Sequence, residues 1–430
     1  MTELRVLIDE EEVGSILQGV GGKLRFVYDD TWRNRIDAVP LSLSLPLTAK
    51  EHPHKAIETF LWNLLPDRDD TLRQIAAEHD ISPRNPFALA GARGEDLPGS
   101  VQIVPLKRIG NLRKRERITR VSEEQLAEVL HNRQRASGKT HIGEDSGFFS
   151  LAGAQPKLAV CRVGGRWYEQ RGYTPSTHII KPSIPDLAQQ VENEHFSLRL
   201  AEAAGLHVIR SEVVKIGDLQ TILVARYDRV RLKGRQRLPL DAAGGKVFRI
   251  HQEDVCSALT VHPANKYQHL GGPGIKQVMR LLEGSGNPDV DRERFMRACA
   301  FNFVIAGVDA HGKNYSLLTE AGGRFRLAPL YDIISALPYD RETYNRLAMA
   351  VGGERKYSKI FPSHWEKTAA ECRYDGRKAV EHVREYIASL PDAVRPVLEG
   401  CRAQGLQLDT INVLIDRLTE RCATLRTLYE

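Results

Sequence analysis

The stretch from residue 299 to residue 334 constrains the fold more than any other part of the chain. Apolar and amide residues recur there at spacings of three and four, which predicts a mostly buried helix over 293–307: Phe295, Ala298, Phe301, Asn302 and Ile305. We expect this helix to end at Gly307, because glycine tolerates left-handed backbone. A polar loop over 308–314 follows, and two short apolar runs then flank Gly322 and Gly323 as in a β-hairpin.

This hairpin is expected to bring an amide and a carboxylate together. If the chain folds back about Gly322 or Gly323, Asn314 lies opposite a residue between 330 and 332, so Asn314 and Asp332 meet at the open end. Directly opposed strand residues lie about 5 Å apart, and two oxygen ligands at that separation can share one magnesium ion. The sequence therefore predicts a metal site built from Asn314 and Asp332.

Asp309 precedes Asn314 by five residues, which is the Asp-x-x-x-x-Asn spacing of the protein-kinase catalytic loop. In that loop the Asp accepts the proton of the substrate hydroxyl and the Asn holds a metal ion. A structural alternative exists for each residue, because Asp332 can cap a helix and the loop composition is common in ordinary turns. The spacing of all three favours phosphoryl transfer, with Asp309 as the catalytic base.

The length of 430 residues allows two or three domains or one large bilobal one. A content of 42% hydrophobic and 27% charged residues is that of a soluble globular protein. The start of the chain lacks a signal-peptide pattern, and no run approaches the ~20 apolar residues that a membrane span needs. We expect a cytoplasmic protein without a membrane partner. Six scattered cysteines show no zinc spacing and are expected to be reduced and structural.

Two further side chains suggest a phosphate-binding lobe. Lys181 ends a short apolar strand at Pro182, and a strand-borne Lys is how kinases neutralise nucleotide phosphates. On the helix expected over 187–204, Glu194 interrupts an apolar stripe, and a partly buried carboxylate needs a cation or hydrogen-bond donors. We predict a Lys181–Glu194 ion pair; an exposed strand-end Lys and a shifted helix face are the alternatives.

A run of mostly small residues lies just before a strand that begins at Leu158, and its backbone N–H groups could approach a phosphate: Ala152, Gly153, Ala154, Gln155, Pro156 and Lys157. The run lacks the spacing of the named glycine-rich phosphate loops, so a plain turn is the alternative. Basic runs at 107–120 and 231–237 could contact nucleic acid, although such runs are more often solvated linkers.

The pattern as a whole predicts an α+β, bilobal, protein-kinase-like fold. We expect an N-terminal subdomain over 1–106, a strand-rich kinase N-lobe over 107–227 and an all-helical C-lobe over 228–430. The predicted phosphate-handling residues occur in both lobes.

These motifs together resemble the HipA family of serine/threonine kinase toxins. The matching stretches cover nearly the whole chain: SLAGAQPKLAV, HIIKP, ENEHFSLRLAEAAGL, ARYDR, HQEDVCSAL, FNFVIAGVDAHGKNYSLL and LAPLYDIISA. The resemblance implies that Asp309 is the catalytic base, that Asn314 and Asp332 bind magnesium, and that Lys181 contacts the phosphates of ATP. It further implies a phosphate loop over 152–157, an adenine-binding hinge formed by Ala225, Arg226 and Tyr227, and a nucleotide site lined by His311, Gly312, Lys313 and Tyr331.

The resemblance also implies regulation and partners. Ser150 corresponds to an autophosphorylated serine whose modification displaces the phosphate loop and inactivates the kinase. Family members pair with a small helix-turn-helix antitoxin, bind operator DNA through that complex, and arrest growth by phosphorylating a protein such as an aminoacyl-tRNA synthetase. Two alternatives stay open: a catalytically silent nucleotide-binding co-repressor scaffold, and a small-molecule phosphotransferase with the same Asp-x-x-x-x-Asn loop.

Overall fold

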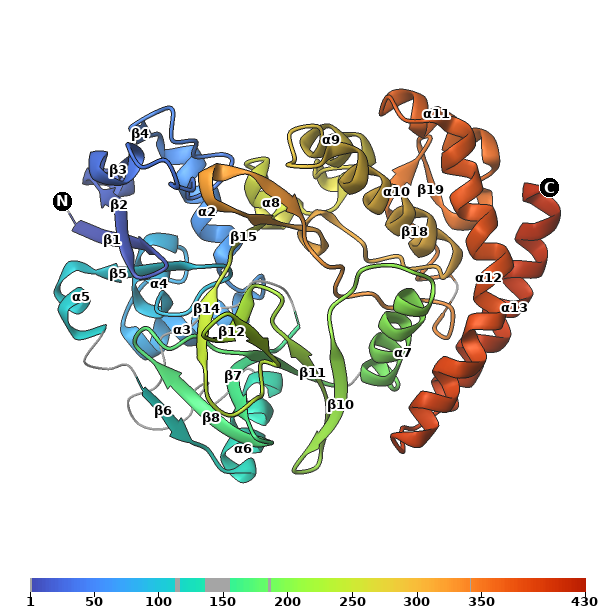
Figure 1. The fold of residues 1–430 in the computed structure, drawn as a ribbon, viewed down its shortest axis with the longest axis horizontal. Helices are drawn as coiled ribbons and strands as arrows, with labels where there is room; N and C mark the ends of the chain where they lie inside the picture. The colour runs from blue at the N-terminus through green and yellow to red at the C-terminus, as the bar shows by residue number, and fades with distance from the viewer. Residues whose placement is uncertain (1, 113–116, 136–154, 185–186, 341) are drawn as a thin grey trace. The chain divides into compact units, whose positions relative to one another are not determined.

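The computed structural model describes residues 2–112, 117–135, 155–184, 187–340 and 342–430 (Figure 1). The chain divides into two compact units. The first unit comprises Met1–Pro182, Val214–Ala264 and Leu317–Arg324, and the second comprises Ser183–Val213, Asn265–Ser316 and Phe325–Glu430. The first unit thus draws residues from all three predicted domains.

The first unit begins with an antiparallel sheet in the order β4-β3-β2-β1-β5. Its strands are β1 (Thr2–Ile8), β2 (Glu11–Gln18), β3 (Leu24–Tyr28), β4 (Glu51–His52) and β5 (Val101–Pro105). Asp9 and Glu10 join the first two strands with φ values of 50° and 72°, as a two-residue hairpin turn requires. Alternate side chains of these strands point into a buried core that α2 (His54–Leu64) and α4 (Pro86–Arg93) help to close.

A second sheet of the first unit has the order β10-β11-β9-β7-β8-β6. Its strands are β6 (Arg117–Arg120), β7 (Leu158–Val163), β8 (Arg166–Arg171), β9 (His178–Pro182), β10 (Ser211–Ile216) and β11 (Leu219–Ala225). The helix α6 (Glu123–Arg135) packs its apolar face against this sheet through Leu126, Val129 and Leu130. Lys181 therefore lies on a central strand, with Ile222 of β11 opposite to it.

The remaining elements of the first unit are short. The helices are α1 (Asp30–Arg33), α3 (Asp69–His79), α5 (Leu106–Leu112) and α8 (Val255–Ala258). A three-stranded sheet consists of β12 (Arg229–Lys233), β13 (Gln236–Leu238) and β14 (Lys246–Arg249), and two further strands are β15 (His251–Asp254) and β16 (Ser316–Thr319). The 3₁₀ turns are Val20–Gly22, Pro263–Asn265 and Ala321–Gly323.

The second unit is mainly helical. Its helices are α7 (Gln190–Ala203), α9 (Ile275–Leu282), α10 (Pro288–Val304), α11 (Pro362–Glu371), α12 (Gly376–Ala403) and α13 (Asp409–Tyr429), with 3₁₀ turns at Gln268–Leu270, Gly312–Asn314 and Tyr357–Lys359. Figure 1 shows α12 and α13 running side by side, and they pack on each other. The ring of Phe301 on α10 meets that of Tyr386 on α12 edge to face, with centroids 5.5 Å apart.

The prediction of an all-helical C-lobe needs a correction. The second unit also contains β17 (Phe325–Leu327) and the antiparallel pair of β18 (Arg346–Val351) and β19 (Glu354–Lys356). Gly352 and Gly353 turn this pair with positive φ values, and Leu347, Ala348, Met349 and Val351 are buried. In the sequence, β18 and β19 are indicated by a short apolar run that precedes two glycines.

The end of α10 also differs from the expectation. The helix ends at Val304, and the left-handed residue is Ala306, with φ of 52°, rather than Gly307. Gly307 is needed for another reason, because a Cβ atom there would lie 2.3 Å from Oδ1 of Asn302. Close approach, not left-handed backbone, therefore explains this glycine.

Two expectations from composition can be compared with the structure. All six cysteines are buried free thiols, which confirms the prediction that they are reduced. Within the described residues, no helix has the length and apolarity that crossing a membrane requires.

Candidate active site

The loop that carries Asp309 is a compact turn at the end of the buried helix α10. The backbone carbonyl of Asp309 accepts the N–H of His311 at 2.8 Å, and the N–H of Asn314 donates to the carbonyl of His311 at 2.9 Å. His311 and Asn314 are at most 9% exposed, whereas the side chain of Asp309 is exposed. A fixed backbone thus presents one carboxylate to solvent.

Asn314 is tied to the same carbonyl. Its Nδ2 donates to the backbone oxygen of Asp309 at 2.8 Å. A backbone carbonyl can only accept hydrogen bonds, so the amide nitrogen must face it and the amide oxygen Oδ1 is directed elsewhere. That orientation suits a residue predicted to offer an oxygen to a metal ion.

The predicted hairpin is present, because the N–H of Ala328 donates to the carbonyl of Ser316 at 2.8 Å and β16 pairs with β17. Beyond this point the N–H of Leu330 donates to the carbonyl of His207 at 2.9 Å, so the approach of Asn314 to Asp332 stays a prediction. The hydroxyl of Tyr331 donates to the carbonyl of Lys313 at 2.6 Å and lies 2.6 Å from Oγ of Ser316. Asp332, the next residue, follows this anchor directly.

Asp332 has left-handed backbone, with φ of 53°. Such a conformation is uncommon outside glycine, and at functional sites it aims a side chain that the surrounding structure holds in place. No cluster of three or more His, Cys, Asp and Glu side chains suited to a metal ion occurs among the described residues. The oxygen donors of Asn314 and Asp332 nevertheless fit magnesium, which keeps several water ligands.

Three residues that were not predicted from the sequence contact this region, and two of them, Asn193 and Ser335, fix the segment after Asp332. Asn193 of α7 donates to the carbonyl of Ser335 at 2.8 Å and accepts the N–H of Ser335 at 3.2 Å. Oγ of Ser335 in turn donates to the carbonyl of Ile305, 2.6 Å away, at the end of α10. The segment after Asp332 is therefore fixed to both helices. A third missed residue is Tyr267, whose hydroxyl donates to Oδ1 of Asp309 at 2.5 Å.

Glu194 is buried as predicted, and it lies beside Asn193 on α7. Its Oε2 accepts a hydrogen bond of 3.0 Å from Nε2 of Gln190, one turn earlier. Lys181 is also buried, with 5% exposure, but it belongs to the first unit whereas Glu194 belongs to the second. The Lys181–Glu194 ion pair stays a prediction.

The predicted phosphate loop falls only partly within the described residues. Ser150, Ala152, Gly153 and Ala154 lie outside them. Gln155 donates from Nε2 to the carbonyl of Pro182 at 3.0 Å, so the described end of the loop lies beside the end of the strand that carries Lys181. Pro156 and Lys157 follow it and are partly buried.

The predicted hinge, Ala225 to Tyr227, leaves β11 beside the strand β9. Ala225 lies opposite His178, and the N–H of Arg226 donates to the carbonyl of Thr177 at 3.0 Å. The hydroxyl of Tyr227 donates to Oε1 of Gln252 at 2.9 Å. The side chain of Arg226 points inward and is buried, so only the backbone of Arg226 could meet a nucleotide.

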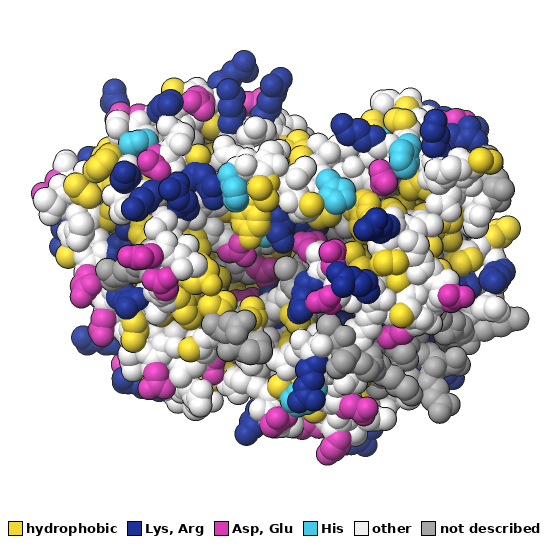
Figure 2. Space-filling view, turned by 180° about the vertical axis from the view of Figure 1, so that it is seen from behind, with side chains coloured by type: hydrophobic (Ala, Val, Ile, Leu, Met, Phe, Trp, Pro, Cys, Tyr) yellow, Lys and Arg dark blue, Asp and Glu magenta, His cyan; other side chains and the backbone are white. Residues whose placement is uncertain are grey.

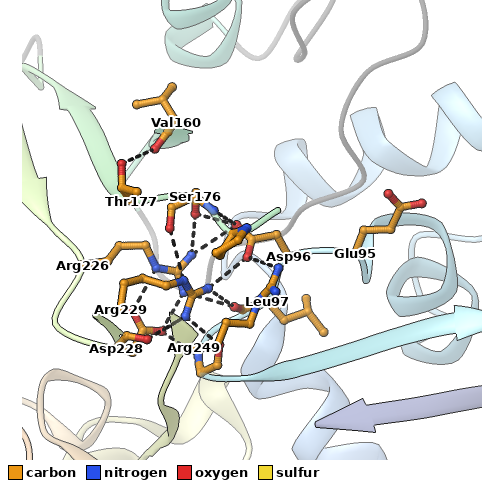
Figure 3. A network of polar contacts seen from close by, with 12 residues as sticks. Glu95, Asp96, Leu97, Val160, Ser176, Thr177, Arg226, Asp228, Arg229 and Arg249 are labelled. Atoms are coloured by element: carbon orange, nitrogen blue, oxygen red, sulfur yellow. Dashed lines mark hydrogen bonds and ion pairs between the residues drawn. The ribbon is translucent and has the colours of Figure 1, made fainter. Parts of the chain in front are cut away.

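A buried network of charges lies beneath this hinge (Figure 3). Arg226 makes two hydrogen bonds to Asp228, of 2.9 and 2.7 Å, and a third of 2.8 Å to Oγ of Ser176. Arg229 donates to Asp96 at 2.9 Å, and Arg249 approaches the same carboxylate oxygen at 3.4 Å. Residues that are distant in the sequence are thus held together by three guanidinium groups around two carboxylates.

The electrostatics of Asp96 follow from these contacts. Burial alone would raise the pKa of Asp96, but the neighbouring guanidinium groups outweigh that effect and hold the pKa at about 2. Burial also disfavours the charge of Asp228, whose pKa is nevertheless lowered by Arg226 and Arg229. Both carboxylates are therefore ionised at neutral pH.

Charged side chains of both signs are interspersed over the face shown in Figure 2. Of the two basic runs, the described part of the first includes β6, whose residues are exposed. In the second run, Arg231 is buried and donates to the carbonyls of Leu240 and Gly244 at 2.9 and 3.0 Å. Arg231 therefore has a structural role in the loop that follows β12.

Comparison with known proteins gives consistent matches. The model of the HipA N-terminal domain matches residues 4–104, and that of the HipA-like C-terminal domain matches residues 149–394. The putative kinase Y4mE of Sinorhizobium fredii is 31% identical over 98% of this chain and 98% of its own length. The serine/threonine-protein kinase toxin HipA of Shewanella oneidensis is 29% identical over 78% of this chain and 75% of its own.

Among solved structures, HipA of Shewanella oneidensis MR-1, in a complex with HipB and its operator DNA, matches with a TM-score of 0.84 at 24% identity. The match covers 99% of this chain and 98% of that one. At this identity the likeness establishes the fold, which confirms the predicted α+β architecture with sheets in the N-terminal half and helices at the C-terminus.

Proposed function

The chain belongs to the HipA family, and from that premise we propose that it is a serine/threonine protein kinase that uses ATP and magnesium. The observation that carries the proposal is the Asp309 loop. The backbone carbonyl of Asp309 accepts the N–H of His311 and Nδ2 of Asn314, so the backbone that carries a solvent-facing carboxylate and the amide of Asn314 are held within a single turn. This arrangement suits phosphoryl transfer, because proteins catalyse that reaction mainly by positioning the reactants and by electrostatic stabilisation.

In the proposed reaction, Asp309 accepts the proton of a serine or threonine hydroxyl as its oxygen bonds to the γ-phosphorus of ATP. The bond from that phosphorus to the bridging oxygen breaks, and ADP leaves. Magnesium, when bound by Asn314 and Asp332, would neutralise phosphate charge. The nucleotide site would also be lined by residues of the second unit, which contains Asn314 and Asp332; these residues are His311, Gly312, Lys313 and Tyr331.

Residues of the first unit are proposed to bind the nucleotide. Lys181 would contact its phosphates together with the loop formed by Ala152, Gly153, Ala154, Gln155, Pro156 and Lys157. The backbone of Ala225, Arg226 and Tyr227 would bind the adenine. Two observations support this division. Lys181 is buried, and the side chain of Arg226 is buried and points inward, which leaves only the backbone of Arg226 for a nucleotide.

We extend the proposal to biology through the relatives. The Shewanella protein is named a kinase toxin, and its solved complex contains HipB and operator DNA. By analogy this chain would act in the cytoplasm as the toxin of a toxin–antitoxin pair, with a small helix-turn-helix antitoxin and operator DNA as partners. Its substrate would be a translation protein, with aminoacyl-tRNA synthetases as the first class to test, and phosphorylation of its own Ser150 would inactivate it.

Replacing Asp309 with Gln tests the kinase proposal. Purified Asp309→Gln should bind a fluorescent ATP analogue like the wild type, yet its transfer of phosphate from radiolabelled ATP should fall by about 100-fold or more, because the proton acceptor is lost. The matched control is Asp416→Gln, which changes an exposed carboxylate on α13 and should retain full transfer. Undiminished transfer by Asp309→Gln would exclude Asp309 as the base.

A further inference from the structure

Tyr267 touches the proposed catalytic base directly. Its hydroxyl lies 2.5 Å from Oδ1 of Asp309, within the range of a hydrogen bond from a hydroxyl to a carboxylate. The phenol can donate only one proton and the ionised carboxylate only accepts, so Tyr267 is the donor. This contact occupies one of the two carboxylate oxygens of Asp309.

The ring of Tyr267 also contacts the proposed catalytic loop. It meets the ring of His311 edge to face, with centroids 4.9 Å apart and planes at 89°. His311 is itself 6% exposed and is tied by its N–H to the carbonyl of Asp309. Tyr267 therefore contacts the proposed catalytic loop at two points, one polar and one aromatic.

The backbone around Tyr267 is anchored on both sides. Before it, the carbonyl of Lys266 accepts the N–H of Gly312 at 3.2 Å, a third link to the same loop. After it, Oε1 of Gln268 accepts the N–H of Ala350 on β18 at 2.6 Å. The carbonyl of Tyr267 also accepts N–H groups of the turn that follows, from Leu270 at 2.9 Å and Gly272 at 3.0 Å.

Close packing fixes this turn further. A Cβ atom at Gly272 would lie 2.2 Å from the backbone oxygen of Asn265, and one at Gly274 would lie 2.6 Å from Nε2 of Gln268. Neither position can accept a larger residue without displacing its neighbours. The segment 265–274 is thus tied to the Asp309 loop and to itself, and it presents the Tyr267 hydroxyl to Asp309.

We propose that Tyr267 is a positioning residue for phosphoryl transfer: it fixes the Asp309 carboxylate through Oδ1 so that Oδ2 faces the substrate hydroxyl. The proposal rests on the assignment of Asp309 as the base. A carboxylate on a flexible Cα–Cβ bond samples several rotamers, and holding one of them increases the fraction of encounters with the correct geometry. Tyr267 itself contacts neither substrate nor phosphate in this scheme.

The test compares Tyr267→Phe, which keeps the ring against His311 but removes the hydroxyl, with the wild type. Phosphate transfer from radiolabelled ATP to dephosphorylated casein should show a kcat lower by about tenfold, while the KM for ATP stays within about twofold, because orientation and not binding is lost. Tyr344→Phe, which removes a hydroxyl from a more exposed ring of the same unit, should leave kcat and KM unchanged.

A second measurement does not depend on activity. Hydrogen exchange of peptides covering 305–316 should become faster in Tyr267→Phe, because the loop loses one of its links, and should be unchanged in Tyr344→Phe. Faster exchange together with an unchanged kcat would overturn the positioning role and leave a purely structural contact. Unchanged exchange and unchanged kcat would overturn the proposal entirely.

If the proposed kinase function is wrong, the measurements would give a different result from a failure of the positioning role. A wild type that binds the ATP analogue but transfers no phosphate would refute the kinase assignment and, with it, the catalytic meaning of Tyr267. The exchange measurement would then still decide whether the Tyr267 hydroxyl holds the Asp309 loop.

Discussion

Glu253 shows how a single buried group sets a pH dependence. Its carboxylate accepts the hydroxyl of Ser42 at 2.6 Å and the N–H of Leu43 at 2.7 Å, both from the loop that precedes β4. Burial raises its pKa from 4.5 to about 7, although these hydrogen bonds favour the charged form. The folded protein therefore holds a proton on Glu253 more tightly than the unfolded chain does.

This difference predicts that stability falls as the pH rises. Below pH 4.5 both states are protonated, whereas between 4.5 and about 7 only the folded state keeps the proton, so the folded state loses an advantage on the order of 3 kcal/mol across that window. Glu253→Gln, which mimics the protonated acid, should lack this loss. Urea unfolding midpoints at pH 5 and pH 8 measure it.

The matched control is Glu128→Gln, which changes an exposed carboxylate on α6 of the same unit. It should follow the wild-type pH profile. If Glu253→Gln also follows the wild-type profile, Glu253 does not titrate between pH 5 and pH 8 and its assigned pKa is wrong.

At the residue scale, the sequence predicted side chains that act through local spacing and missed those that act through distant contacts. Asp309 and Asn314 lie five residues apart, and the structure joins them through one carbonyl. Tyr267 precedes Asp309 by 42 residues in a segment with no recognisable motif. Asn193 carried a weak signal, as an uncharged polar residue in a helix that also buries Glu194, but its partner Ser335 is 142 residues away.

At the scale of elements, the network around Asp96 holds together parts that the sequence treats as separate. Asp96 lies in the connection between α4 and β5, Arg226 precedes β12, Arg229 begins it, and Arg249 ends β14. The region matched by the HipA N-terminal domain is thereby joined to the predicted hinge within the first unit. A buried charge that loses its partner is costly, so this junction should be sensitive to neutralisation.

We predict that Asp96→Asn destabilises the first unit by about 3–5 kcal/mol, because three guanidinium groups would each lose an ion pair. The urea midpoint followed by tryptophan fluorescence should fall accordingly. Asp392→Asn, an exposed change on α12, should stay within about 0.5 kcal/mol of the wild type. A midpoint for Asp96→Asn equal to that of this control would show that the network contributes little to stability.

Element boundaries illustrate what periodicity can and cannot predict. The buried face of α10 was visible in its spacing of three and four, whereas its end at Val304 depends on Ala306 taking left-handed backbone, which no local preference favours. The pair β18 and β19 was missed because its apolar run is short. The hairpin after Asn314 was predicted correctly because two glycines fix where the chain turns.

At the scale of the whole molecule, the proposed nucleotide-binding residues occur in both units: Lys181 and Ala225 to Tyr227 belong to the first, whereas His311, Gly312, Lys313 and Tyr331 belong to the second with the proposed catalytic and metal-binding residues. The sequence predicted phosphate-handling residues in both the strand-rich and the helix-rich parts. It did not predict that the chain returns to the first unit at Val214–Ala264 and Leu317–Arg324, because such crossings depend on contacts between distant segments.

The measurement that tests the central claim most directly is intact and peptide mass spectrometry of phosphatase-treated protein after incubation with ATP and magnesium. We predict one added phosphate, located at Ser150, in the wild type and none in Asp309→Gln. Equal phosphate in both proteins, or none in either, would contradict the claim that this chain is a serine kinase that uses Asp309 as its base.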